Sequence, residues 1–198
     1  MGLNAQDIVT FATSWPHPIK TTTQVYDIRD RLGLQRLYKK VQKTRSSAHN
    51  SNIANVFMKL AGQAMHHGYE VTDVMKDAVA DDRVRFRPDL GLKVQGKYRF
   101  FVEVQLSRIQ ATRWGTKFRN YLRLYERGYG PFRVLFLVDS PGDIIRLREY
   151  ARDILREKHP ALNMFLFMSL ADFKFQRDVL KAHVWQGAWT RERVPLIR

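Results

Sequence analysis

The sequence predicts an α/β protein with a mixed β-sheet flanked by helices. Two observations predict this fold class. Segments with the apolar spacing of amphipathic helices alternate with shorter segments that have the spacing of strands. The composition is that of a folded protein, because 44% of the 198 residues are hydrophobic and 12% are aromatic. We expect a helical unit at residues 1–48, an α/β core at 49–170 and a C-terminal tail packed on the core at 171–198.

Residues 1–48 are predicted to form short helices. Three such segments are recognisable, and the third has apolar residues on one face and cations on the other, among them Arg36, Lys39 and Lys40. Three short helices of which the last is basic fit a helix-turn-helix unit, whose third helix enters a DNA major groove. A helical extension with a solvated basic face explains the same pattern equally well.

The first half of the core is predicted to contain a helix and three strands. In Asn52–His66 the apolar residues recur every three or four positions, which is typical of an amphipathic helix. Tyr69–Val74 alternates between polar and apolar residues, as a half-buried strand does. Arg83–Val94 and Lys97–Leu106 are two further strand-like segments, and the sequence Gln95-Gly96-Lys97 predicts a hairpin turn between them.

The second half of the core is predicted to alternate between helices and buried strands. A long helix is expected at Ile109–Arg127, followed by a strand at Phe132–Val138, where a near-continuous apolar run indicates burial on both faces. Pro141–Lys158 is predicted to be helical, with Ile144 and Ile145 among its inward residues, and Ala161–Ser169 to be a second buried strand. The tail is expected to contain one short helix within irregular sequence.

The charge of the chain points to a polyanionic partner. Thirty-four Lys and Arg residues against 19 Asp and Glu residues give a formal net charge of +15. The cations are spread over the whole chain instead of one amphipathic helix, which favours nucleic acid over anionic lipid. Charge alone does not distinguish DNA from RNA. No apolar run reaches the ~18 residues that a membrane span needs, and there are no cysteines, so we expect a soluble cytoplasmic protein without a membrane partner.

Two acidic residues on the predicted hairpin are candidates for chemistry. Counting outward from the turn puts Asp89 on the second strand nearly opposite Glu103 on the third. Gln105 lies two residues after Glu103 and therefore points to the same face of the sheet. Because two carboxylates on an apolar framework repel each other unless a cation joins them, the pair predicts a site for a hard divalent ion such as Mg²⁺. The alternative is a pair of ordinary surface carboxylates on an exposed sheet face.

Pro88-Asp89 followed by Glu103-Val104-Gln105, in a helix–strand–strand–strand–helix–strand order, resembles the PD-(D/E)xK nuclease superfamily. The resemblance implies a restriction-endonuclease-like core and cleavage of DNA that depends on Mg²⁺ or Mn²⁺. It implies that Asp89 and Glu103 ligate the metal with the help of the Val104 carbonyl. The third motif position is usually a lysine that orients and activates the attacking water, and here it is Gln105.

Because a neutral amide cannot supply the charge of that lysine, we expect a nearby cation to supply it. The candidates are Lys93 on the second strand, and Arg113 and Lys117 on the following helix. No Asp or Glu balances the cations of that helix before Glu126. We therefore expect the helix to bind phosphates of the nucleic acid backbone, although a solvated face is the alternative. The cations concerned are Arg108, Arg113, Lys117, Arg119 and Arg123.

A second resemblance is to the replication-relaxation family of plasmids and conjugative elements, which includes mobilisation accessory proteins. It rests on the helix-turn-helix-like start of the chain and on four short motifs, His49-Asn50, Arg87-Pro88-Asp89-Leu90, Phe101-Val102-Glu103-Val104 and a Lys117…Tyr121…Tyr125 helix. This resemblance implies DNA binding at a replication or transfer origin and leaves cleavage open.

The sequence therefore leaves three candidate functions. The first is a DNA-nicking endonuclease in the replication, mobilisation or recombination of a mobile element. The second is a non-catalytic DNA-binding factor that recruits a relaxase, a recombinase or a replication initiator. The third is an RNA-binding protein, which gives the carboxylate pair no role. A homodimer is an open alternative to a monomer in each case.

Overall fold

The computed structural model describes residues 47–75, 87–106, 111–155, 161, 163–190 and 192–197. Residues 1–46, which hold most of the predicted helix-turn-helix unit, lie outside the described residues. The predicted nucleic-acid contacts Arg36, Lys39, Lys40 and Arg108 lie outside them as well. In the described part of the chain, no helix combines the length and apolarity that a membrane span needs.

Helix α4 (Ser47–His66) crosses the boundary between two compact units, Met1–Ala61 and Gly62–Arg198. The helix begins at Ser47 and not at Asn52 as predicted. Residues 47–51 are polar but contain no glycine or proline, so nothing in them stops a helix. The apolar stripe of the helix is buried, as its periodicity predicts, and consists of Ile53, Val56, Phe57, Leu60, Ala61 and Ala64.

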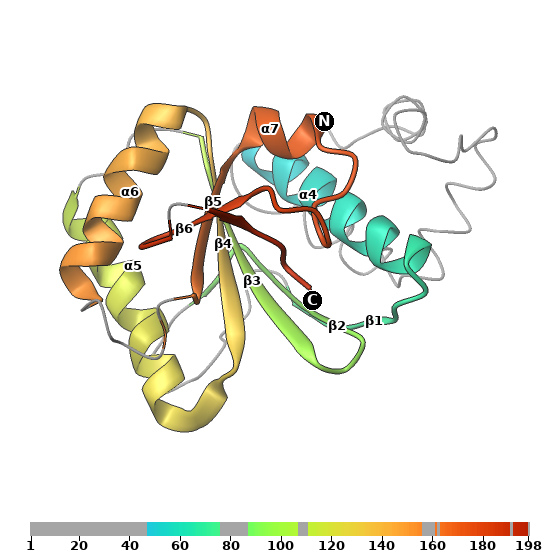
Figure 1. The fold of residues 1–198 in the computed structure, drawn as a ribbon, viewed down its shortest axis with the longest axis horizontal. Coiled ribbons are helices and arrows are strands. Elements are labelled where there is room, and N and C mark those ends of the chain that lie inside the picture. The colour runs from blue at the N-terminus through green and yellow to red at the C-terminus, as the bar shows by residue number, and fades with distance from the viewer. Residues whose placement is uncertain are drawn as a thin grey trace. The chain divides into compact units, whose positions relative to one another are not determined.

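The second unit contains a seven-stranded mixed sheet whose described strands lie in sequence order (Figure 1). The first three strands form an antiparallel meander, the next two run parallel to the third, and the last two are antiparallel again. The strands are β1 (Val71–Met75), β2 (Leu90–Val94), β3 (Tyr98–Gln105), β4 (Phe132–Val138), β5 (Phe165–Ser169), β6 (Trp185–Gly187) and β7 (Arg193–Val194). The predicted α/β class with a mixed, helix-flanked sheet is confirmed.

The turn between β2 and β3 fixes how these two strands are paired. Gln95 and Gly96 have positive φ angles of 55° and 60°, as both central residues of a type I′ turn require. The Lys97 N–H donates to the Val94 carbonyl across the turn at 3.2 Å. The predicted hairpin is confirmed, and its register joins Val94 to Tyr98 and Leu90 to Val102.

Strand β2 is shorter than predicted. It begins at Leu90, so Pro88 and Asp89 precede the strand and do not lie within it. Proline has no N–H to donate to a strand ladder, and the Asp89 side chain accepts a hydrogen bond from the Val104 N–H at 2.8 Å. The carboxylate therefore contacts the backbone of β3 where the β2–β3 ladder ends.

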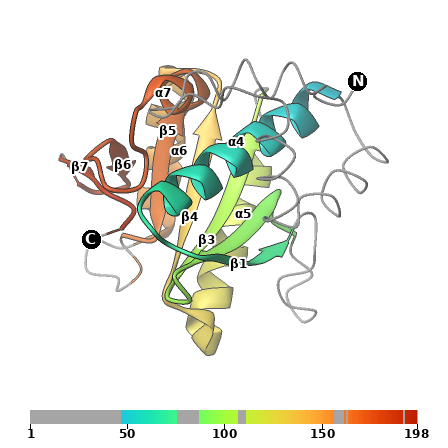
Figure 2. The same cartoon turned by 90° about the vertical axis from the view of Figure 1, so that its right-hand side faces the viewer.

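Two helices connect the parallel strands and cover one face of the sheet. Helix α5 (Ala111–Leu124) joins β3 to β4 and ends in a π-helical turn, η1 (Tyr125–Tyr129), while α6 (Pro141–Ile154) joins β4 to β5. Parallel strands need such crossovers. Figures 1 and 2 show β3, β4 and β5 side by side, with both helices on the same side of them.

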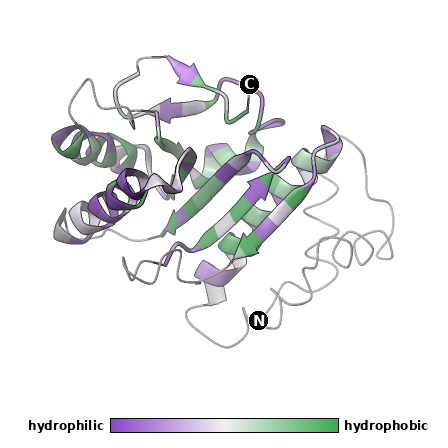
Figure 3. Cartoon of the chain, turned by 90° about the horizontal axis from the view of Figure 1, so that it is seen from below, coloured by the Kyte–Doolittle hydropathy of each residue, from purple (hydrophilic) through white to green (hydrophobic). Residues whose placement is uncertain are grey.

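The main core lies between these helices and the sheet. The Phe136 ring of β4 stacks on Phe167 of β5 with a centroid distance of 5.4 Å, and Phe118 of α5 lies 4.8 Å from Phe165. Figure 3 shows mostly hydrophobic colour on the central strands and a mixture of hydrophobic and hydrophilic colour on the helices beside them, as amphipathic helices have. The prediction that Ile145 faces inward is wrong, because its side chain is 59% exposed. The buried positions Ile144, Leu147 and Ala151 define the inner face of α6.

The C-terminal segment contains more regular structure than predicted. Its short helix is present as α7 (Leu170–Phe175), but β6 and β7 were not predicted. They have three and two residues, which is too short for an alternating pattern to be recognised. Because β6 pairs with β5, this segment extends the sheet.

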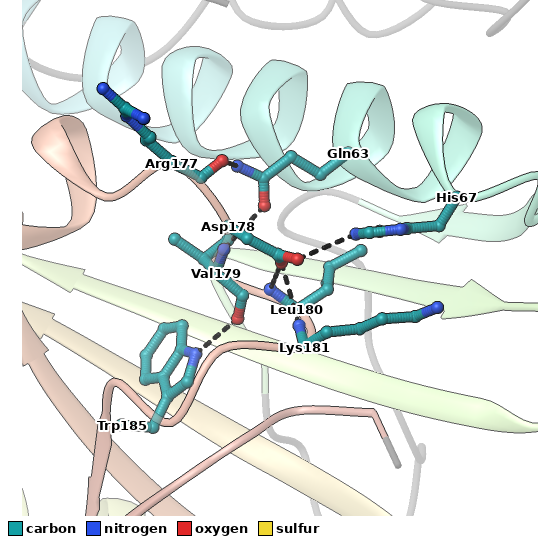
Figure 4. A network of polar contacts seen from close by, with 8 residues as sticks. All are labelled: Gln63, His67, Arg177, Asp178, Val179, Leu180, Lys181 and Trp185. Atoms are coloured by element: carbon teal, nitrogen blue, oxygen red, sulfur yellow. Dashed lines mark hydrogen bonds and ion pairs between the residues drawn. The ribbon is translucent and has the colours of Figure 1, made fainter. Parts of the chain in front are cut away.

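Within the second unit, side chains at the end of α4 and just after it hold the segment that follows α7 (Figure 4). The Gln63 amide donates to the Arg177 carbonyl at 2.8 Å and accepts from the Val179 N–H at 2.7 Å. His67 contacts the Asp178 carboxylate at 2.9 Å. The Trp185 indole N–H donates to the Val179 carbonyl at 2.7 Å, so this loop is tied to β6 as well.

Candidate functional site

Glu103 is a carboxylate inside the apolar layer between the sheet and α5. It pairs in register with Phe136, and its neighbour two positions earlier, Phe101, belongs to the same buried cluster as Phe136 and Phe118. Residues two apart on a strand share a face, so the Glu103 side chain is directed toward α5. Glu103 is only 1% exposed, so the prediction's alternative of ordinary surface carboxylates is wrong for this residue.

Two side chains of α5 bind the two oxygens of Glu103. The Lys117 ammonium forms an ion pair with Oε2, and the Tyr121 hydroxyl donates to Oε1 at 2.8 Å. Lys117 and Tyr121 are four residues apart and therefore lie on the same face of the helix. Lys117 also lies 5.8 Å from the centre of the Trp114 ring. The pair of helix residues thus fixes the orientation of the carboxylate.

The surroundings of Glu103 raise its pKa. Burial has the largest effect and raises the pKa from 4.5 to about 7, aided by the charge of Asp89 and opposed by Lys117 and by the Tyr121 hydrogen bond. Burial also raises the pKa of the Tyr121 hydroxyl, and the neighbouring Glu103 charge adds to this effect. A carboxyl with a pKa near 7 takes up and releases protons at neutral pH, which makes Glu103 unusual among glutamates.

Asp89 lies beside Glu103, at the end of the β2–β3 hairpin. The register joins Leu90 to Val102, and continuing it by one residue puts Asp89 opposite Glu103. Two further observations agree: the Asp89 carboxylate accepts from the Val104 N–H, and its charge raises the pKa of Glu103. The structure therefore brings Asp89, Glu103 and the Val104 backbone together.

Gln105 lies close to Asp89 and Glu103, whereas Lys93 does not. Gln105 is half-buried at the end of β3 and shares the face of Glu103. Lys93 lies four residues beyond Asp89, about 13 Å along β2. Its ammonium is 3.6 Å from the Asp73 carboxylate, so the structure does not bring Lys93 to the carboxylate pair.

The cations of α5 are divided between the site and the surface. Lys117 reaches Glu103, whereas Arg113, Arg119 and Arg123 are exposed. Arg113 lies one helical turn before Lys117. Helix α5 therefore has one cation, Lys117, at the buried carboxylate and several arginines exposed to solvent.

The sequence analysis did not predict two features of the structure: the role of Tyr121 at the site and the burial of the charged Lys59. Tyr121 was noted only as part of a family motif. Its position four residues after Lys117 indicates that the two side chains share one face of the helix, which could have pointed to it. Lys59 lies among the buried apolar residues of α4 and is 6% exposed. Burial lowers the pKa of Lys59 to about 8.

The chemistry of the donor set fits a hard divalent cation. Two carboxylates and one ammonium leave a local charge of about −1 when all three are ionised. Mg²⁺ is commonly held by one or two carboxylates, with carbonyl oxygens and waters completing its shell. Among the described residues, no three His, Cys, Asp or Glu side chains are grouped so that they could hold a metal ion, so an ion at this site would rely on Asp89 and Glu103 as its side-chain ligands.

No protein-family model, no curated protein and no solved structure matches this chain.

Proposed function

We propose that the protein is a DNA-cleaving enzyme with a PD-(D/E)xK-type core, which hydrolyses phosphodiester bonds with the help of Mg²⁺ or Mn²⁺. One observation supports this most directly: a carboxylate in an apolar layer, Glu103, has a second carboxylate, Asp89, beside it and an ammonium, Lys117, in contact. The connection of β2, β3, α5 and β4 supports it as well, since it follows the order that the motif requires.

Asp89, Glu103 and the Val104 carbonyl would hold the ion, which supplies Lewis-acid activation of water and phosphate when bound. Tyr121 keeps one oxygen of Glu103 in a fixed orientation. Lys117 favours the ionised form of Glu103 and brings a positive charge to the place where Gln105 cannot supply one. In this proposal Lys117, from the helix, replaces the usual motif lysine of the strand.

The exposed arginines of α5 would bind the DNA backbone. Arg113, Arg119 and Arg123 are exposed on the helix that contributes Lys117. Guanidinium groups form strong hydrogen bonds with phosphates, and such contacts fix the position of the strand without reading its sequence. A phosphate chain that follows the helix would thus pass close to the carboxylate pair.

A second candidate is a DNA-binding factor without catalysis, which would recruit a relaxase, a recombinase or a replication initiator. One observation favours it: both oxygens of Glu103 already have partners, Lys117 and Tyr121, so the carboxylate is stabilised without a metal. In that case the ion pair would be a structural link between α5 and β3.

A plasmid-nicking assay distinguishes the two candidates. Supercoiled DNA is incubated with the wild-type chain, Asp89→Asn, Glu103→Gln and a control, Asp153→Asn, with Mg²⁺, with Mn²⁺ and with a chelator. Asn at position 89 retains an oxygen that can accept from the Val104 N–H, which protects the fold. We expect nicking only with metal, at least a hundredfold slower in the two site variants, and unchanged in the control, whose residue is exposed on α6.

Two other outcomes would overturn the proposed enzyme. Salt-sensitive binding of duplex DNA without nicking in any metal would overturn the enzyme and leave the accessory factor. Preferential binding of structured RNA in a competition assay would overturn both candidates.

A further inference from the structure

A cavity of about 290 Å³ lies at the other end of the parallel strands from the carboxylate pair. Residues that open β3 and β4 line it, together with Tyr125 of the π-helical turn. Arg99 lines the cavity and lies four residues before Glu103, a separation of about 13 Å along β3. The cavity is therefore a second feature of the sheet, made of residues that the proposed active site does not use.

The lining is strongly cationic. Lys97, Arg99 and Arg133 all contribute to it, and none of the described lining residues is an Asp or a Glu. The Arg133 guanidinium donates to the Pro195 carbonyl, and because Arg133 pairs with Phe100 it does not share a sheet face with Arg99. The Arg99 guanidinium lies 5.8 Å from the centre of the Tyr129 ring and donates to the Tyr129 carbonyl at 3.5 Å. The Lys97 ammonium lies 5.1 Å from the centre of the Tyr98 ring. The groups in these contacts are neutral and do not cancel the positive charges of Arg99 and Lys97. The cavity therefore favours an anionic ligand.

The same cavity is also aromatic. Tyr98, Tyr125 and Phe132 line it, and the rings of Tyr125 and Phe132 meet edge to face with centroids 6.4 Å apart. Aromatic faces next to arginines are the features on which proteins stack nucleobases. An inorganic anion would leave this apolar surface unused.

We propose that the cavity binds a single nucleotide, with its phosphate at Arg99 and Lys97 and its base against the Tyr125 ring. The volume suits a ligand no larger than a single nucleotide, since pockets for small molecules span ~300–1,000 Å³ and this cavity, at about 290 Å³, lies just below that range. The nucleotide is either a free nucleoside monophosphate or the phosphorylated end of a strand. Both sources present the same chemistry, a phosphate joined to a flat ring.

Calorimetric titration of the full chain without divalent metal tests the proposal. The probes are thymidine 5′-monophosphate, thymidine and inorganic phosphate. We expect the monophosphate to bind at least tenfold more tightly than thymidine or phosphate. Arg99→Gln is expected to weaken binding at least tenfold and Lys97→Gln severalfold. Arg146→Gln is the matched control, because Arg146 is exposed on α6 and lies near Asp143, away from the cavity.

Lys97 is exposed in the hairpin turn, so Lys97→Gln decides the result if Arg99→Gln fails to fold. A thymidine tetranucleotide with a 5′-phosphate separates the two sources: tighter binding than the mononucleotide identifies a strand end, and weaker binding identifies a free nucleotide. No binding of the monophosphate, equal binding of phosphate alone, or unchanged binding in both cavity variants would overturn the proposal. Glu103→Gln is expected to bind the nucleotide normally, so this test does not depend on the proposed enzyme.

Discussion

Lys117 of α5 forms an ion pair with Glu103 of β3 across the apolar layer of the protein. The two ends of the pair differ in environment: the lysine side chain is 31% exposed, whereas the glutamate side chain is 1% exposed. The ammonium thus connects a buried carboxylate to the surface of the helix that also presents Arg113, Arg119 and Arg123. In the proposed enzyme this connection replaces the lysine that the motif lacks.

Lys117→Met is expected to destabilise the protein in a pH-dependent way. Removing one partner of a buried ion pair leaves the other uncompensated, which costs ~3 kcal/mol when the carboxylate is ionised. The loss in the free energy of unfolding should therefore be large at pH 8 and small at pH 5, where Glu103 is protonated. Urea unfolding at both pH values measures it, with the exposed Lys181→Met as control. An equal loss at both pH values would contradict the expectation.

Glu103 should make the wild-type chain less stable as the pH rises. The pKa of Glu103 is raised from its ordinary value of 4.5 to about 7 in the folded state, so between these two pH values the folded state binds a proton that the unfolded state has lost. The contribution of Glu103 to the free energy of unfolding is then most favourable below pH 4.5 and falls by roughly 3 kcal/mol as the pH rises through 7, after which it is constant.

Glu103→Gln lacks this contribution. The difference in unfolding free energy between variant and wild type should therefore move in favour of the variant between pH 5 and pH 8. Denaturant unfolding at these two pH values gives the difference directly. A difference that does not change with pH would show that Glu103 has an ordinary pKa.

Tyr121→Phe tests the second partner of Glu103. The substitution removes the hydroxyl that donates to Oε1 and keeps the buried ring. A hydrogen bond to a charged group contributes ~1.5–3 kcal/mol, so a loss in this range is expected at pH 8. Tyr129→Phe, at an exposed residue, should have no measurable effect in the same unfolding assay. Equal stability of the two variants would mean that the Tyr121 hydroxyl does not stabilise the carboxylate.

Replacing the exposed arginines of α5 should weaken DNA binding without changing its sequence preference. Each of Arg113→Gln, Arg119→Gln and Arg123→Gln is expected to lower the slope of log affinity against log salt by about 1, because each phosphate contact releases a counterion. Fluorescence anisotropy with two unrelated duplexes at several salt concentrations measures the slopes. Arg146→Gln on α6 is the control, and slopes identical to its own would exclude α5 from the DNA interface.

The sequence predicted the geometry of the carboxylate pair because a turn fixes the register on both sides of it. Gln95 and Gly96 have the positive φ angles of a tight hairpin, so counting outward from them was enough to bring Asp89 near Glu103. The end of β2 was harder to predict. Pro88 and Asp89 fit the pattern of the strand, but the proline lacks a donor and Asp89 binds the Val104 backbone.

The choice among cations could not be made from the sequence. Lys93, Arg113 and Lys117 were equivalent as charges, and only the packing of α5 on β3 separates them. Lys117 and Tyr121 face Glu103 because the crossover helix lies over that strand, which is a tertiary relationship without a local pattern. The short strands β6 and β7 were missed for a related reason, since pairing with β5 and with each other defines them.

Binding of Mn²⁺, measured by electron paramagnetic resonance as free ion lost from solution, shows whether Asp89 and Glu103 hold a metal ion. We expect one bound Mn²⁺ per chain at pH 7.5, displaced by Mg²⁺, with at least tenfold weaker binding in Asp89→Asn and in Glu103→Gln and no change in Asp153→Asn. Absence of a bound ion in the wild-type chain, or equal binding in all four proteins, would contradict this expectation.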